Sequence, residues 1–267
     1  MQGLGNDFVV IDRRVHPVAL DVPGLTAIAD RRLGIGCDQV LVIDPPANGC
    51  AAADMLIFNP DGSPAEACGN GTRCVARLLM DEDGSESLTI RTVAGDLACA
   101  RSGEAVAVDM GLVRTEWDEI PLSEAADTLN LPIQEGPLST PVGVNVGNPH
   151  LVFFVEDAEA IDLPALGPIL EHHSMLPERA NIEIVQVLSP THLRMRVWER
   201  SAGITQACGS GACASAVAAN RRGLTEKSVT VTLDGGDLGI EWLENGHVLM
   251  SGPTAVSFTG SITLPAG

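Results

Sequence analysis

The sequence predicts a mixed α/β fold, of the α+β kind, built from two homologous domains. The chain has 267 residues, enough for about two domains of ordinary size. Hydrophobic residues make up 45% of it and charged residues 19%, a mixture typical of globular rather than disordered proteins. The third observation is an internal repeat, which sets where the chain divides.

Two cysteine turns anchor the repeat. Cys68-Gly69-Asn70-Gly71 matches Cys208-Gly209-Ser210-Gly211, 140 residues further along (208 − 68). Further segments match in the same order at similar spacings: 4–10 with 146–152, 39–42 with 181–184, 58–68 with 198–208, and 95–97 with 236–238. We therefore predict domains at residues 1–113 and 114–252, with 253–267 as a C-terminal segment that returns to the first domain.

Apolar runs of strand length occur at equivalent places in the two halves. They cover residues 8–12, 40–43 and 54–58 in the first half, and 151–155, 182–185 and 193–198 in the second. Glycine turns then separate hairpin strands at 88–100 with 105–110, and at 229–233 with 238–250. Each half should therefore be mostly β.

A helix is expected directly after each cysteine turn, because apolar side chains there share one helical face. The first helix should end near Asp83-Gly84 and the second near Arg222-Gly223. Two further helices are predicted over residues 25–33 and 163–172.

The charge balance argues against several functions. Lys+Arg is 16 and Asp+Glu is 35, a net charge of −19, which repels phosphate backbones and anionic lipid, so neither a nucleic acid nor a membrane partner is expected. The single lysine, Lys227, lies in a polar stretch and is a poor candidate for the Schiff base of pyridoxal phosphate. No apolar run approaches the roughly 20 residues that span a bilayer, and Met1-Gln2-Gly3 does not open a signal peptide. We expect a cytoplasmic protein with reduced thiols.

The cysteine turns are the candidate catalytic sites. Glycines allow a tight backbone path and expose successive N–H groups, and a helix start adds partial positive charge. Such a place binds a carboxylate and lowers the pKa of a thiol. We therefore predict that Cys68 and Cys208 are acid/base groups, and that the other cysteines are packing residues: Cys37, Cys50, Cys74, Cys99 and Cys213.

Two thiols on opposite faces of one carbon suit racemisation or epimerisation by two bases. A thiolate removes the proton, and a thiol returns a proton on the far side. The carbanion charge spreads into the substrate carboxylate, toward the N–H groups of the two turns. This chemistry requires no cofactor and no metal. Zinc at Cys208 and Cys213 is disfavoured, since no histidine lies near either cysteine pair.

Four motifs resemble the diaminopimelate epimerase family. They are Gly3-Leu4-Gly5-Asn6-Asp7-Phe8, Ala67-Cys68-Gly69-Asn70-Gly71-Thr72-Arg73-Cys74, Gly147-Asn148-Pro149-His150, and Glu199-Arg200 followed by Gln206-Ala207-Cys208-Gly209-Ser210-Gly211. The resemblance implies two pseudo-symmetric domains, each a barrel-like, mostly antiparallel sheet around a central helix, with the active site in the cleft between them. It also implies interconversion of LL- and meso-2,6-diaminopimelate, a diamino dicarboxylic acid, for lysine and peptidoglycan precursor synthesis.

The resemblance further implies roles for the matching positions. Cys68 and Cys208 would form the acid/base pair, His150 and Glu199 would support it, and Arg200 would suit the distal carboxylate. The remaining substrate-binding positions would be Asn6, Gln39, Asn59, Gly69, Asn70, Asn148, Asn181, Gly209 and Ser210. Ser201 and Ile204 stand where many members of the family have Gly and Glu, which puts fine substrate selectivity in doubt.

Two other functions compete with this one. Proline racemase and hydroxyproline epimerase also use two thiols, but their substrates lack a distal amino acid head, and Glu199-Arg200 with Asn148-Pro149-His150 favours the longer substrate. A non-enzymatic binding or thiol-sensing protein would need no second cysteine. A homodimer is a possible assembly.

Overall fold

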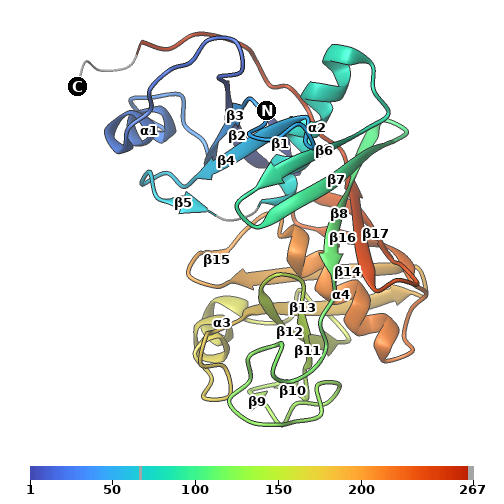
Figure 1. Ribbon diagram of the computed structural model, residues 1–267. Coiled ribbons are helices and arrows are strands. Elements are labelled where there is room, and N and C mark those ends of the chain that lie inside the picture. Colours follow the sequence, from blue (N-terminus) through green and yellow to red (C-terminus); the bar gives the residue numbers. More distant parts are fainter. Residues whose placement is uncertain (66–67, 264–267) are drawn as a thin grey trace. The chain divides into compact units, whose positions relative to one another are not determined.

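The computed structural model describes residues 1–65 and 68–263, which form two compact units (Figure 1). Unit 1 is Met1–Val108 with Gly252–Gly267, and unit 2 is Asp109–Ser251. The expected domain boundary was at 113/114, and strand β8 (Ala105–Leu112) spans the division between the units. Ala67 of the family-like motif and residues 264–267 of the expected return segment lie outside the described residues.

In unit 1 the strands follow the order β1-β2-β3-β4-β6-β7-β8, with β5 paired to β4. The β2–β3 and β4–β6 pairs are parallel, and the others are antiparallel. The bounds are β1 Gln2–Gly3, β2 Asn6–Asp12, β3 Gln39–Asp44, β4 Ala53–Phe58, β5 Pro64–Ala65, β6 Ser87–Thr92 and β7 Gly95–Ser102.

In unit 2 the order is β11-β12-β13-β14-β16-β17-β18, with β15 paired to β14 and a separate β9–β10 hairpin. The β12–β13 and β14–β16 pairs are parallel, and the others are antiparallel. The bounds are β9 Gln134–Glu135, β10 Leu138–Ser139, β11 Val142–Asn145, β12 Pro149–Val155, β13 Asn181–Ser189, β14 His192–Glu199, β15 Gly203–Ile204, β16 Ser228–Leu233, β17 Gly236–Trp242 and β18 His247–Gly252.

The sequence repeat is also a repeat of strand pairing. Phe8 pairs with Gln39 in unit 1, and His150 pairs with Asn181 in unit 2. Further along, Phe58 pairs with Pro64, as Trp198 does with Ile204. Because equivalent residues pair in both units, the prediction of two homologous halves is confirmed.

A helix packs against each sheet directly after its cysteine. Helix α4 (Gly209–Arg221) contacts β11, β12, β13, β14, β16 and β17, and its residues 211–219 are all buried. The sheet of unit 2 therefore wraps around a central helix. Helix α2 (Gly69–Asp83) contacts β1, β2, β6 and β7, and ends as predicted at Gly84, whose φ of 73° suits a glycine cap.

Each sheet has one further helix on its opposite face, α1 in unit 1 and α3 in unit 2. Helix α3 (Leu163–Glu171) follows its prediction closely, but α1 runs from Val22 to Ala29 and not over 25–33. It begins early because the Asp21 carboxylate accepts the N–H of Gly24 at 2.8 Å. It ends early because the Asp30 carboxylate accepts the N–H groups of Arg32 and Leu33, which form a turn.

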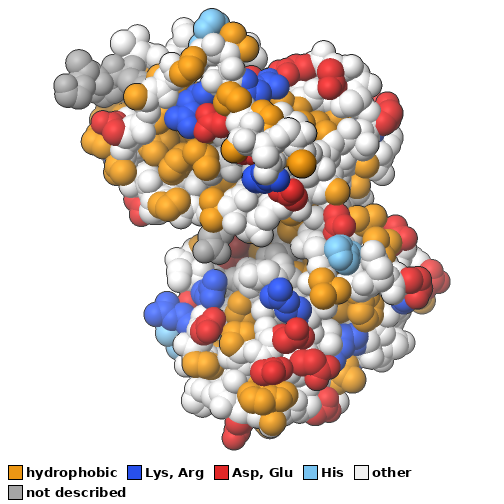
Figure 2. Space-filling model, in the orientation of Figure 1, with side chains coloured by type: hydrophobic (Ala, Val, Ile, Leu, Met, Phe, Trp, Pro, Cys, Tyr) orange, Lys and Arg blue, Asp and Glu red, His pale blue; other side chains and the backbone are white. Residues whose placement is uncertain are grey.

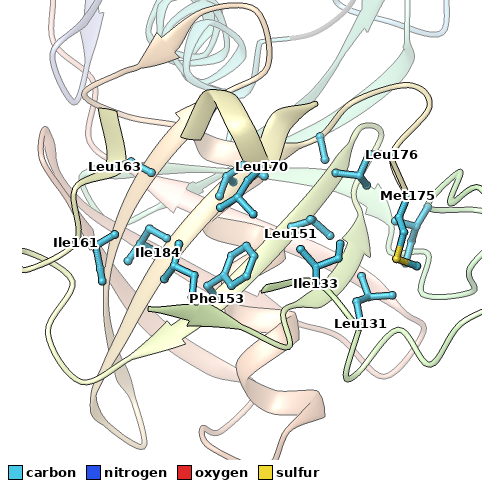
Figure 3. Close-up of a cluster of buried hydrophobic side chains, with 14 of the residues drawn as sticks. Leu131, Ile133, Leu151, Phe153, Ile161, Leu163, Leu170, Met175, Leu176 and Ile184 are labelled. Carbon is cyan, nitrogen blue, oxygen red and sulfur yellow. The ribbon is translucent and has the colours of Figure 1, made fainter. Parts of the chain in front are cut away.

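Alternation along the strands decides which residues face the central helix. Leu151, Phe153 and Ile184 belong to a buried cluster beside Leu163 and Leu170 of α3 (Figure 3). Residues between them along β12 and β13 point to the other face of the sheet, where α4 packs. The equivalent cluster in unit 1 joins α1 to alternate residues of β3. Each sheet thus has an outer apolar face and an inner face toward its cysteine helix.

The remaining chain holds smaller features. The segment that carries the β9–β10 hairpin was not predicted from the sequence. The C-terminal segment does return to unit 1, where Ala255 and Gln2 exchange backbone hydrogen bonds of 2.9 and 3.0 Å. Figure 2 shows acidic side chains over the visible face of each unit. In the part of the chain that the structure describes, no helix is both long and apolar enough to cross a membrane.

Candidate active site

Each predicted cysteine caps the helix that follows it. Cys68 precedes α2 with φ −152° and ψ 100°, and its Sγ accepts the N–H of Gly71 at 3.3 Å. Cys208 precedes α4 with φ −113° and ψ 107°, and its Sγ accepts the N–H of Gly211 at 3.4 Å. Both sulfurs therefore lie at a helix N-terminus, in the same position of the two units.

The second glycine of each turn, Gly71 or Gly211, is closely packed against a strand. A Cβ at Gly71 would lie 3.0 Å from Leu41 Cδ1 on β3. A Cβ at Gly211 would lie 2.9 Å from Glu183 Oε1 and 3.2 Å from the Cys208 sulfur. Each cysteine turn thus rests directly on a strand residue beneath it, and that residue differs between the units.

Cys208 is surrounded by groups that oppose its ionisation. It is buried, with 4% of its surface exposed. Burial raises the pKa of the Cys208 thiol well above its usual value, and the carboxylates of Glu199 and Glu183 raise it further. Hydrogen bonds from Ser210 and Gly211 act in the opposite direction but are outweighed. The predicted lowering of the pKa at a helix start is therefore wrong for Cys208, whose pKa is raised.

Glu199 lies at the end of β14 and faces this thiol. Its carboxylate hydrogen-bonds Cys208 and accepts the hydroxyl of Thr205. Burial raises the pKa of Glu199, although these hydrogen bonds and the nearby His150 act against the increase. Glu199 is thus in direct hydrogen-bonding contact with the Cys208 thiol.

His150 forms the centre of a buried polar row on β12 and β13. It is 0% exposed. Its Nδ1 lies 2.7 Å from Glu183 Oε1, and its Nε2 lies 2.9 Å from Asn148 Oδ1. Asn181 Nδ2 approaches Nδ1 at 3.5 Å. Glu183 was missed at the sequence level, although it is a glutamate inside an apolar strand run, which is a recognisable signal.

Two buried side chains accept hydrogen bonds from the backbone of the loop that carries Arg200. Asn181 Oδ1 accepts the backbone N–H of Arg200 at 2.7 Å, and Glu171 Oε1 accepts that of Ser201 at 3.0 Å. The guanidinium of Arg200 donates to the carbonyl of Glu178 at 3.0 Å. Glu171, 3% exposed, is a second residue that sequence reasoning missed.

The predicted residues of unit 1 form two amide pairs. Asn70, in the first turn of α2, donates to Asn6 Oδ1 at 3.3 Å, and Asn6 donates to Asp38 at 2.9 Å. Gln39 donates to Asn59 Oδ1 at 3.2 Å. In unit 1, Asn70 and Asn6 lie beside the Cys68 turn, while Gln39 and Asn59 pair with each other. In unit 2, Glu199 contacts Cys208, and His150 contacts Asn148 and Asn181. The Arg200 guanidinium is not brought to Cys208 by any of these contacts, because it is bonded to the Glu178 carbonyl.

The other cysteines divide by burial. Burial raises the pKa of Cys74 and Cys99 to about 12, and Cys37 and Cys213 are buried as well, which fits packing roles. Cys50 is exposed, so its predicted packing role is wrong. Within residues 1–65 and 68–263, no group of three His, Cys, Asp or Glu side chains is arranged to hold a metal ion.

The fold matches that of solved structures. The crystal structure of a hydroxyproline epimerase from Agrobacterium vitis matches with a TM-score of 0.65 at 15% sequence identity, over 94% of this chain and 86% of that chain. At this identity the likeness identifies the fold alone, two repeated units of sheet and helix.

The sequence identifies the family. Residues 1–116 and 142–256 match the diaminopimelate epimerase family, and the unmatched stretch contains the unpredicted β9–β10 hairpin. The diaminopimelate epimerase of Rhodospirillum centenum is 56% identical over 264 residues, covering 98% of this chain and 91% of the relative. That of Acidiphilium cryptum is 49% identical over 263 residues, covering 98% and 94%. The chain belongs to the diaminopimelate epimerase family.

Proposed function

We propose that this chain interconverts LL- and meso-2,6-diaminopimelate by a two-cysteine mechanism that uses no cofactor. The observation that carries the proposal is the duplicated cysteine turn. In it, Cys68 caps helix α2 by accepting the N–H of Gly71, and Cys208 caps helix α4 by accepting the N–H of Gly211. Membership of the diaminopimelate epimerase family supports the substrate.

The two sulfurs have unequal surroundings, which suggests how the roles divide. Cys208 is buried beside two carboxylates, so it starts as the thiol that donates a proton. The mechanism then needs Cys68, which is only partly buried, as the thiolate that removes the α-proton from the opposite side. The roles exchange in the reverse direction, because each turnover leaves the proton on the other sulfur. The proposal requires that both turns face one substrate.

The N–H groups of the two helix starts would hold the reacting α-carboxylate. Gly69 and Asn70 begin α2, and Gly209 and Ser210 begin α4, so each turn offers N–H groups and a positive helix end to an anion. These groups would also stabilise the charge that develops when the α-proton leaves. Arg200 would bind the distal carboxylate.

Substrate turnover tests the proposal. The purified protein is mixed with LL-diaminopimelate, L-proline or trans-4-hydroxy-L-proline, and inversion is followed by chiral chromatography. We expect conversion of LL- to meso-diaminopimelate and no inversion of the two single-head substrates. Inversion of L-proline without turnover of diaminopimelate would contradict the substrate assignment. The role in lysine and peptidoglycan precursor synthesis, the cytoplasmic location and the homodimer stay predictions.

A further inference from the structure

The two units differ in the pair of residues beneath the cysteine turn. In unit 2 this pair is His150 on β12 and Glu183 on β13. The equivalent pair in unit 1 is Phe8 on β2 and Leu41 on β3. Leu41 Cδ1 would be 3.0 Å from a Cβ at Gly71, and Glu183 Oε1 would be 2.9 Å from one at Gly211. The same fold is therefore built with an apolar pair in one unit and an ionisable pair in the other.

Stability does not explain the ionisable pair. His150 and Glu183 are both 0% exposed, and none of the described residues donates a hydrogen bond to Glu183 Oε2. Taking charged groups out of water is unfavourable, and an apolar pair of similar volume is often as stable or more so. Since unit 1 folds with Phe8 and Leu41, unit 2 retains His150 and Glu183 for another reason.

The geometry of the pair fixes the orientation of a third side chain. His150 Nε2 faces Asn148 Oδ1 at 2.9 Å and donates its proton there. Nδ1 and Glu183 Oε1, 2.7 Å apart, then share one proton. With its oxygen on the histidine ring, the Asn148 amide must direct its NH₂ group away from the ring. Glu183 thus determines the direction in which Asn148 can donate.

We propose that Glu183 is a positioning residue of the epimerisation site, which holds His150 and, through it, Asn148 in the orientation that the reaction at Cys208 requires. This inference rests on the proposed function and adds to it a residue that does not itself touch the substrate. The ionisable groups that face Glu183 are His150 from β12, Glu199 from β14 and Cys208 at the start of α4.

The charge of Glu183 has a second, measurable consequence. It is one of the two carboxylates that raise the pKa of Cys208. Burial raises the pKa of Glu183 itself, and His150 acts against this increase. Glutamine at this position carries no charge at any pH, so the pKa of Cys208 falls and the thiol is lost at a lower pH. The alkaline limb of the pH–rate profile, where Cys208 must be protonated to act as the acid, then moves to lower pH.

Two substitutions separate orientation from charge. In Glu183→Gln the amide N–H can still donate to His150 Nδ1, so the ring and Asn148 stay in place while the charge is lost. Glu183→Leu introduces the unit 1 residue and removes the hydrogen bond as well. Glu244→Gln is the matched control, because it removes a carboxylate whose side chain is 92% exposed.

We expect Glu183→Leu to lower kcat for LL-diaminopimelate by about 10²-fold, the order of loss when a reacting group is misplaced by an ångström. Its KM should change by less than about tenfold, and its circular dichroism should match the wild type. Glu183→Gln should keep more activity than Glu183→Leu and shift the alkaline limb to lower pH. Glu244→Gln should behave as the wild type in both respects.

The inference is overturned if folded Glu183→Leu has wild-type kcat. It is also overturned if the decrease in kcat is fully explained by a smaller fraction of folded protein. If Glu183→Leu does not fold, the decision rests on Glu183→Asp, whose shorter side chain keeps the carboxylate but withdraws it from His150 Nδ1, now 2.7 Å from Oε1. A folded Glu183→Asp with lowered kcat supports the inference, and wild-type kcat overturns it. A wild-type protein that does not epimerise diaminopimelate contradicts the proposed function instead, so the two failures are distinguishable.

Discussion

Replacement of Cys208 by serine or by alanine separates helix capping from catalysis. The sulfur accepts the N–H of Gly211 at 3.4 Å, and serine can make the same contact because it is a preferred N-cap residue. Alanine cannot. If Cys208 matters through capping, the two variants should differ in activity; if it matters as an acid/base group, both should be inactive.

The stability effects follow from the structure. Loss of a good N-cap costs about 0.5–2 kcal/mol, and a weak sulfur acceptor at this distance should be near the lower end. Loss of a buried sulfur atom, at a residue 4% exposed, adds about 1 kcal/mol for the vacated space. Cys208→Ala should therefore lose about 1–2 kcal/mol. Cys208→Ser keeps the cap and should lose about 1 kcal/mol or less.

The catalytic effects should be alike in the two variants. A serine hydroxyl does not ionise at neutral pH and is a poor proton donor to a carbanion, so each variant should lose about 10²–10⁴-fold in turnover or more. The assay compares the thermal midpoint, at roughly 2–4 °C per kcal/mol for this size of chain, with the rate of inversion of LL-diaminopimelate. Cys68→Ser and Cys68→Ala should behave in the same way. Turnover in any of the four variants within tenfold of the wild type would refute the acid/base assignment.

Three further predictions concern the surroundings of the turns. Gly211→Ala should lower both the thermal midpoint and turnover, because the added methyl group would crowd Glu183 and Cys208. Overpacking of about 1–3 kcal/mol exceeds the gain of about 1 kcal/mol from helix propensity. An unchanged thermal midpoint and rate would show that this crowding is absent. Cys74→Ala and Cys213→Ala should leave turnover within a few fold of the wild type, since both thiols are buried packing groups, and a loss comparable to that of the catalytic cysteines would contradict this. Glu199→Gln should let Cys208 react with iodoacetamide at lower pH, because one of the carboxylates that raise the pKa of Cys208 is gone. Peptide mass spectrometry would follow alkylation of Cys208 across pH 7–10. Identical pH profiles for the variant and the wild type would show that the Glu199 carboxylate has no effect.

Much of the fold was predictable because the two halves of the chain carry equivalent sequence patterns. The strand runs and the helix after each cysteine follow from local periodicity, and the repeat confirmed each by a second copy. The stretch that carries the β9–β10 hairpin has no counterpart in the repeat and no strong periodicity, so it could not be predicted. The early end of α1 at Ala29 depends on the Asp30 side chain bonding the backbone of Arg32 and Leu33, a local choice that the apolar pattern does not reveal.

The site was predictable only where it depends on local sequence. A cysteine before glycines and a helix is a local feature, and both turns were found from it. The ionisation of Cys208 depends instead on Glu183 and Glu199, which come from two different strands. The role of Glu183 likewise depends on the parallel pairing of β12 with β13, which sets His150 beside it. Such relationships arise from tertiary packing and are absent from any short segment.

The most direct test of the central claim follows the label during inversion in D₂O. LL-diaminopimelate is converted to a few per cent by the wild-type protein, and deuterium at the α-carbon is measured separately in the meso product and in the remaining LL substrate. With one sulfur on each side of the carbon, the product takes its new hydrogen from a deuterated thiol, and the recovered substrate stays unlabelled. If the remaining substrate gains deuterium as fast as the product, one base serves both faces and the two-cysteine account is wrong.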